Sequence, residues 1–303
     1  MTRRETLKNL RGVFTPMITP FSARGKLDEG AFRANLRFLS ASGISGVLVA
    51  GSTGEAPHLT IPERLRLIDI ARASVKPPQV LIAGAGLEST AHTIELSREA
   101  AQRGADAVLL LPPAYYKPAL RPDVLAAHFG AVADGVRVPT LIYSIPQYTG
   151  YRMDVEMLGR LARHPNVVGL KESSGDFSFV QAILRKVPRN FSVFAGAAPV
   201  LIDALNAGAA GGILGQSNFA PSLCAAIYEA FRAGVLESAE RLHQRLMILA
   251  TEITVAWGIP GIKAAVDLAG GRGGAPRLPL MPVNGAARRK IAAALKRAGD
   301  TAS

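Results

Sequence analysis

The stretch RGADAVL, residues 103–109, joins a helical pattern to a strand-like run, and the chain contains two further versions of it. SGISGVL at residues 42–48 and AGAAGGI at residues 207–213 also place a glycine just before an apolar run. A glycine can end a helix in the left-handed conformation, so that a strand follows at once. The three stretches therefore predict a repeated helix-to-strand joint.

Apolar runs of strand length recur eight times along the chain. They lie at residues 12–18, 46–50, 80–83, 107–111, 140–143, 167–170, 191–194 and 211–214. The segments between them have helical periodicity. Strands that alternate with helices pair in parallel, and eight such units favour a closed barrel over an open sheet. We predict an α/β fold, a (β/α)8 TIM barrel. Residues 1–220 would form its core, and residues 221–303 its last helix plus a C-terminal helical extension, in a single structural unit.

A dinucleotide-binding fold is the structural alternative. The stretch AGAGLES, residues 83–89, follows a strand-like run, as such a turn would. Ser89, however, stands where the third glycine of that motif is required. The barrel is therefore favoured.

The composition is that of a globular protein, because 49% of the 303 residues are hydrophobic and 19% are charged. Cys224 is the single cysteine, which excludes an internal disulfide and a cysteine-cluster metal site, and we expect it to fill a small space in the core. No apolar run approaches eighteen residues, and the start lacks the apolar segment of a signal peptide. We expect a cytoplasmic protein without a membrane partner.

The formal net charge of +12 could indicate nucleic-acid binding. The basic residues are dispersed, however, and their densest cluster, residues 286–297, is typical of a terminal amphipathic helix with a solvated basic face. We expect no nucleic-acid partner, only a positive field that attracts small anions.

A lysine ends one of the apolar runs. Lys171 closes VVGLK, residues 167–171, and in a barrel the active-site groups lie at the C-terminal ends of strands. Apolar surroundings disfavour the charged ammonium, so such an amine can be a nucleophile near neutral pH and form a Schiff base with a ketone. The alternative is a lysine that pairs with Glu172 and points to solvent.

Three other segments at strand ends carry useful side chains. Tyr143 would lie beside Lys171 on the neighbouring strand and could relay protons, or could be an ordinary core tyrosine. Ser52 and Thr53, in GSTGE at residues 51–55, could receive a carboxylate or could belong to a plain turn before a helix. The stiff loop around Tyr115 and Tyr116 could serve an oligomer contact or a site.

Metal-dependent and serine-hydrolase chemistry have little support. The five histidines, which show no pair at helical spacing, are His58, His92, His128, His164 and His243. No nucleophile-elbow motif occurs either. We predict no metal and no cofactor.

Taken together, these segments resemble the dihydrodipicolinate synthase and N-acetylneuraminate lyase superfamily of class I aldolases, over about residues 10–282. The motifs that carry the resemblance are GSTGE at residues 51–55, the tyrosine pair at 115–116, YSIP at 143–146 and KESSGD at 171–176. The resemblance implies a barrel, a homotetramer built as a dimer of dimers, and a lysine imine with pyruvate. It reverses the solvent-facing interpretation of Lys171.

The resemblance also implies roles for individual residues. Lys171 would form the imine, and Tyr143 would move protons with Tyr116 of an adjacent subunit. Ser52 and Thr53 would hold the pyruvate carboxylate, Ser52 among the catalytic residues. Further substrate contacts would come from Ser144, Gly196 and Ile213.

Departures from the family's motifs bear on the second substrate. Tyr148 stands where the synthases have an arginine that grips the carboxylate of aspartate semialdehyde, and a phenol cannot supply that clamp. YSIP, together with GIPGIK at residues 258–263, looks closer to 4-hydroxy-2-oxoglutarate aldolase. GIPGIK itself is expected to be a structural turn that opens a C-terminal helix. Thr53, by contrast, is the residue of the synthases.

We therefore expect reversible cleavage of 4-hydroxy-2-oxoglutarate to pyruvate and glyoxylate. The alternatives are 4-hydroxy-tetrahydrodipicolinate synthase, another 2-keto-acid aldolase or dehydratase, and a non-catalytic keto-acid sensor. Consumption of aspartate semialdehyde with pyruvate would favour the synthase, and the absence of a pyruvate imine would favour a non-catalytic protein.

Overall fold

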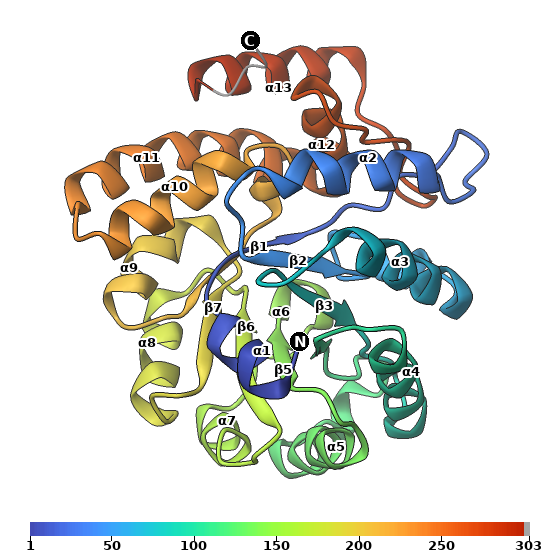
Figure 1. Cartoon of the computed structure of the whole chain (residues 1–303), viewed down its shortest axis with the longest axis vertical. Helices are drawn as coiled ribbons and strands as arrows, with labels where there is room; N and C mark the ends of the chain where they lie inside the picture. Colours follow the sequence, from blue (N-terminus) through green and yellow to red (C-terminus); the bar gives the residue numbers. More distant parts are fainter. Residues whose placement is uncertain (300–303) are drawn as a thin grey trace. The chain divides into compact units, whose positions relative to one another are not determined.

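The computed structural model describes residues 1–299, and in this part of the chain eight parallel strands form one closed barrel in sequence order (Figure 1). The strands are β1 (Gly12–Pro16), β2 (Gly46–Val49), β3 (Val80–Gly84), β4 (Ala107–Leu110), β5 (Thr140–Ser144), β6 (Val167–Glu172), β7 (Ser192–Ala195) and β8 (Gly211–Ile213). The predicted (β/α)8 fold is confirmed, and each predicted strand occurs with ends that differ by at most two residues.

The strands are apolar because both of their faces are covered. Every residue of β1, β2, β4, β5, β6 and β8 is buried, as expected for a parallel sheet enclosed by helices. The pairing of β5 with β6 sets Tyr143 opposite Lys171 and Ser144 opposite Glu172. Parallel register thus brings the two predicted catalytic side chains onto neighbouring strands.

The chain divides into two compact units, and the first comprises Met1–Arg11 and Pro77–Ile213. It contains β3 to β8, and the helices between these strands lie outside them (Figure 1). Its helices are α1 (Arg3–Asn9), α4 (Thr90–Gln102), α5 (Pro122–Gly135), α6 (Pro146–Thr149), α7 (Val155–Leu161), α8 (Phe177–Lys186) and α9 (Leu201–Asn206), with short 3-10 turns η2 (Lys117–Ala119) and η3 (Ala198–Val200).

The second unit begins at Gly12, runs to Lys76 and resumes at Leu214. It contains β1 and β2, two helices after them and the C-terminal helices. These are α2 (Glu29–Ser40), α3 (Ile61–Ser74), α10 (Pro221–Arg232), α11 (Leu236–Leu249), α12 (Ala256–Leu268) and α13 (Gly285–Arg297), with 3-10 turns η1 (Ala56–His58) and η4 (Gly215–Asn218) and a π-helical segment η5 (Ala250–Val255). The predicted helical extension thus consists of α11 to α13.

The repeated joints have the conformation that their glycines predict. Gly43, Gly104 and Gly208 have φ angles of 80°, 90° and 106° just before their strands. Gly86, in the stretch considered as a dinucleotide-binding turn, is required for packing. A Cβ there would lie 2.5 Å from the backbone nitrogen of Leu111. Close packing of two backbones explains that glycine.

One long helical run departs from the sequence expectation. Leu236–Leu268 spans 33 residues and contains an 18-residue window with a mean hydropathy of 1.3, so by length and composition alone it could cross a membrane. It is kinked at Gly258, where φ is 57°, and packs on α10 and α13. Lys263 in this run is buried and forms an ion pair with Glu55. A buried ammonium needs such a partner within the protein. Cys224, in α10, is buried as predicted.

Candidate active site at the ends of strands β5 and β6

The predicted nucleophile is enclosed by the protein. Lys171 lies in β6, is only 3% exposed, and its Nζ atom lies 4.2 Å from the centre of the Tyr143 ring. Within residues 1–299 no carboxylate forms an ion pair with Lys171. A lysine that pairs with Glu172 and points to solvent is therefore ruled out, and the amine lies against an aromatic face.

Glu172 occupies a separate buried position beside the nucleophile. Its Oε1 atom accepts hydrogen bonds from the Ser174 N–H at 2.9 Å and from the Ser144 hydroxyl at 3.4 Å. Burial raises the pKa of Glu172, while the hydrogen bonds from Ser174 and Ser144 lower it. Its Oε2 atom has no hydrogen-bond partner among the described residues. Burial dominates because neither oxygen contacts a cation.

Gly196 and Ile213, two of the predicted substrate contacts, lie at the ends of β7 and β8. Gly196 comes directly after β7, and its N–H donates to the Glu172 carbonyl at 2.6 Å. A Cβ there would lie 1.9 Å from the Ser173 hydroxyl, so only glycine fits. Ile213 ends β8 and is fully buried. Gly196 thus adjoins the lysine strand, whereas the substrate contacts assigned to Gly196 and Ile213 stay predictions.

The tyrosine loop faces away from the protein. Tyr115 and Tyr116 are 78% and 73% exposed, and their rings pack edge to face with centres 5.0 Å apart. The loop is anchored through its backbone, because the N–H groups of Ala114 and Tyr115 donate to the carboxylate of Glu88 at 3.0 Å each. Large exposed aromatic side chains are typical of contact surfaces, and the role of Tyr116 in an adjacent subunit stays a prediction.

In the second unit, the GSTGE stretch forms a compact turn after β2. The Glu55 N–H donates to the Ser52 carbonyl at 3.0 Å, and the Thr19 hydroxyl donates to the Gly54 carbonyl at 2.7 Å. No Cβ fits on Gly54, because it would lie 2.8 Å from the carbonyl oxygen of Met17. Among the described residues, the hydroxyls of Ser52 and Thr53 bind no protein group. These donors remain available for an anion.

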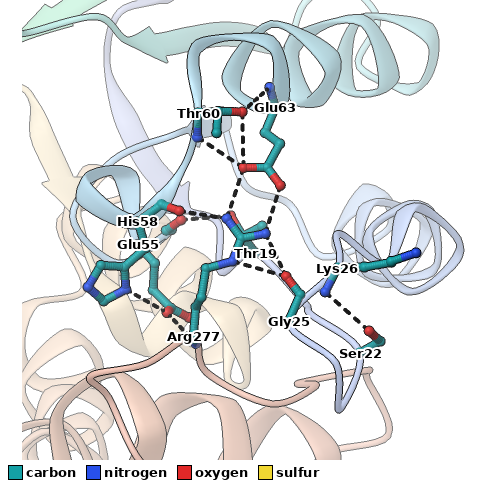
Figure 2. A network of polar contacts seen from close by, with 10 residues as sticks. Thr19, Ser22, Gly25, Lys26, Glu55, His58, Thr60, Glu63 and Arg277 are labelled. Carbon is teal, nitrogen blue, oxygen red and sulfur yellow. Dashed lines mark hydrogen bonds and ion pairs between the residues drawn. The ribbon is translucent and has the colours of Figure 1, made fainter.

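A polar network that the sequence did not predict lies behind this turn. Glu55 and Arg277 meet there, together with His58 and Glu63 (Figure 2). Lys263 forms an ion pair with Glu55. Glu55 belongs to GSTGE and Lys263 to GIPGIK, two stretches that were interpreted only as motifs. A charged residue inside an otherwise apolar or glycine-rich stretch could have indicated a buried charge. Nothing in the sequence indicated which charged residues form ion pairs with one another.

The described residues contain no group of three or more histidine, cysteine, aspartate or glutamate side chains that could hold a metal ion. His58 contacts Glu55, His128 contacts Thr90, and His164 contacts Asp134. Each of these three histidines therefore has a local partner.

Comparison with known proteins gives the same family. The sequence profile described as "Dihydrodipicolinate synthetase family" matches residues 9–298. The chain is 37% identical to a 4-hydroxy-tetrahydrodipicolinate synthase of Moorella thermoacetica, over 95% of this chain and 98% of the relative, and 35% identical to the same enzyme of Bartonella bacilliformis, over 96% and 98%. YagE of E. coli K12, a prophage protein solved in complex with pyruvate, superposes with a TM-score of 0.90 at 27% identity, covering 96% of this chain and 99% of YagE.

These relatives correct one expectation. YSIP and the missing arginine at Tyr148 favoured 4-hydroxy-2-oxoglutarate aldolase. The full-length relatives at 35% and 37% identity are synthases instead, so that expectation is wrong and the synthase alternative is favoured. GIPGIK lies in the kinked start of α12, where it shapes a helix and bears little on the second substrate.

Proposed function

The chain belongs to the dihydrodipicolinate synthetase family, and from this membership we propose that it is a 4-hydroxy-tetrahydrodipicolinate synthase, which condenses pyruvate with aspartate semialdehyde. Like its family, it is a carbon–carbon lyase of the Schiff-base type. The observation that carries the proposal is the buried amine of Lys171 against the Tyr143 ring. A lysine amine at the end of a barrel strand can attack a ketone and form a Schiff base.

Lys171 supplies the nucleophile in this proposal. Its amine attacks C2 of pyruvate, and loss of water leaves an imine between Nζ and C2. Loss of a proton from C3 then gives an enamine, whose C3 forms the new carbon–carbon bond with the aldehyde carbon of the semialdehyde. The amine of the semialdehyde displaces Nζ from C2, which closes the ring and returns Lys171.

Proton transfers fall to Tyr143, because its ring is the group that contacts Nζ. A phenol can give a proton to the departing water and to the new alkoxide, and can take one back during ring closure. We assign to Tyr116 of an adjacent subunit, within a homotetramer, the exchange of these protons with solvent. The exposure of Tyr116 in the single chain supports this assignment.

The carboxylate of pyruvate is assigned to Ser52 and Thr53. The support is that both hydroxyls lack protein partners and that their turn follows a barrel strand, where substrates of such barrels bind. Ser144, Gly196 and Ile213 complete the proposed set of substrate contacts.

The proposal is tested by adding pyruvate and aspartate semialdehyde and following the product with a coupled reductase. Wild type should turn over, and Lys171→Ala should lose at least about 10³-fold in rate, because the covalent route is gone. Lys186→Ala is the matched control, since Lys186 is an exposed lysine of the same unit. Borohydride should trap a pyruvate adduct on Lys171 of the wild type.

Two results would count against the proposal. Turnover that persists in Lys171→Ala contradicts the imine mechanism. A trapped pyruvate imine without turnover of the semialdehyde contradicts the synthase assignment and favours another keto-acid lyase or a keto-acid sensor.

A further inference from the structure

Glu55 closes the turn that carries Ser52 and Thr53, and it does so in an unusual conformation. Its φ angle is 56°, in the left-handed region that side chains other than glycine, asparagine and aspartate rarely adopt. Its N–H donates to the Ser52 carbonyl at 3.0 Å, and the next N–H, of Ala56, donates to the Gly51 carbonyl at 3.2 Å. The shape of the turn therefore depends on Glu55 staying in this conformation.

The side chain of Glu55 is fully buried and is held from the C-terminal part of the chain. Lys263 Nζ lies 2.5 Å from Oε1, and both side chains are at most 2% exposed. The main-chain N–H of Arg277 donates to Oε2 at 2.9 Å, and His58 Nδ1 lies 3.2 Å from the same oxygen. Removing one member would leave a buried charge unpaired, so the contacts constrain Glu55 strongly.

The side chain of Arg277 binds residues that follow Glu55 in the chain, His58 and Glu63 (Figure 2). It donates to the His58 carbonyl at 2.6 Å and to the Gly25 carbonyl at 2.6 Å, and it forms a bidentate pair with Glu63 at 2.7 and 2.8 Å. The guanidinium also lies 4.1 Å from the centre of the Phe21 ring. Bidentate pairs are directional, so Arg277 sets the position of residues 55–63 relative to the loop before α2.

We propose that Glu55 is a positioning residue, and that Lys263 and Arg277, acting through it, hold Ser52 and Thr53 in the geometry that binds a substrate carboxylate. The inference rests on the proposed function, because it takes Ser52 and Thr53 as the carboxylate-binding residues. None of the three touches substrate. They act by keeping in place the hydroxyl and N–H groups of the turn.

A purely structural role predicts something different. If the network only stabilised the fold, folded variants would bind pyruvate normally and would differ from wild type only in melting temperature. A positioning role predicts weaker pyruvate binding in a protein that is still folded and still forms the imine once pyruvate saturates it.

The experiment titrates pyruvate and measures the fraction of borohydride-trapped imine, together with kcat and KM. The variants are Lys263→Met, which keeps the length of the side chain without its charge, Arg277→Gln, and the doubly neutral Glu55→Gln with Lys263→Met. We expect the half-saturating pyruvate concentration to rise about tenfold or more, because displaced binding groups lose much of their effect. The imine fraction and kcat at saturating pyruvate should change less.

Two further variants separate the alternatives. Arg66→Gln is the matched control, because Arg66 forms a bidentate pair with Glu29 in the same unit without contacting the turn, and it should bind pyruvate like wild type. Arg277→Lys keeps the charge but loses the bidentate hydrogen bonds of the guanidinium. Its pyruvate affinity should therefore lie between those of wild type and Arg277→Gln.

If Lys263→Met does not fold, Arg277→Gln carries the test, since its side chain is 20% exposed. Wild-type half-saturation in folded Arg277→Gln overturns the inference, as does a fall in kcat at unchanged KM. Absence of a pyruvate imine in the wild type would instead overturn the proposed function, and the inference with it.

Discussion

The Nζ atom of Lys171 lies 4.2 Å from the centre of the Tyr143 ring, and the two residues are opposite each other on β6 and β5. Because the contact is with the ring, the phenol oxygen can be removed without removing the packing. Tyr143→Phe should lower kcat by about 10²- to 10⁴-fold, the usual contribution of a proton-transfer group, and should still form a pyruvate imine. Steady-state rates and borohydride trapping measure the two effects. Tyr151→Phe is the control, and a Tyr143→Phe rate within a few-fold of wild type would refute the relay.

The resemblance described above implies that Tyr148 replaces an arginine that would bind the carboxylate of the semialdehyde. It lies in α6 and is 63% exposed, so an arginine can replace it without disturbing the core. Tyr148→Arg should lower KM for aspartate semialdehyde by about tenfold, because a charge-assisted hydrogen bond contributes about 1.5 to 3 kcal/mol. KM for pyruvate should not change. Tyr148→Phe separates the effect of the cation from loss of the phenol, and an unchanged KM in Tyr148→Arg would show that the acceptor carboxylate binds elsewhere.

Glu172 gives a pH dependence of stability. Burial raises its pKa above the ordinary 4.5, so the folded state binds the proton more tightly than the unfolded state. Its stabilising contribution is complete below the unfolded pKa and is lost as pH rises through the folded pKa. Glu172→Gln, which is neutral at every pH, should therefore gain stability relative to wild type between pH 5 and pH 8. Urea unfolding at pH 5 and pH 8 measures the difference in free energy of unfolding between the variant and wild type. A wild type that gains stability relative to Glu172→Gln from pH 5 to pH 8 would contradict the prediction.

Glu63 makes the free energy of unfolding depend on pH in the opposite direction. The hydrogen bond from Arg277 lowers its pKa to about 2, so its contribution is present above the unfolded pKa of 4.5 and is lost as pH falls towards 2. Allowing for its partial exposure, Glu63→Gln should lower the free energy of unfolding by about 2 kcal/mol at pH 7. The difference from wild type should shrink by pH 3.5. Glu29→Gln, in a more exposed pair, should have little effect, and a pH-independent difference for Glu63→Gln would argue against the ion pair.

The strand that contains Lys171, the proposed nucleophile, shows how much a local sequence pattern can predict. Residues 167–170 were predicted as the strand because they are apolar, whereas β6 continues through Lys171 and Glu172. Charge normally marks a strand end, and it was misleading here because the surrounding barrel buries both side chains. The YSIP and GIPGIK motifs misled in a similar way. YSIP spans the end of β5 and the start of α6, and GIPGIK lies in α12, whereas the relatives that corrected the expectation match over the full length of the chain.

The alternation of strands and helices and the glycine joints are local properties, and the barrel follows from them because side-chain periodicity reports which faces are buried. The role of Lys171 as nucleophile came from the resemblance to the family and stays a prediction. The network around Glu55 is of another kind. Glu55 and Arg277 are 222 positions apart, and no periodic pattern connects them. Only the folded chain brings Lys263 and Arg277 to Glu55, because a buried charge has to find its partner wherever the packing of distant segments places one.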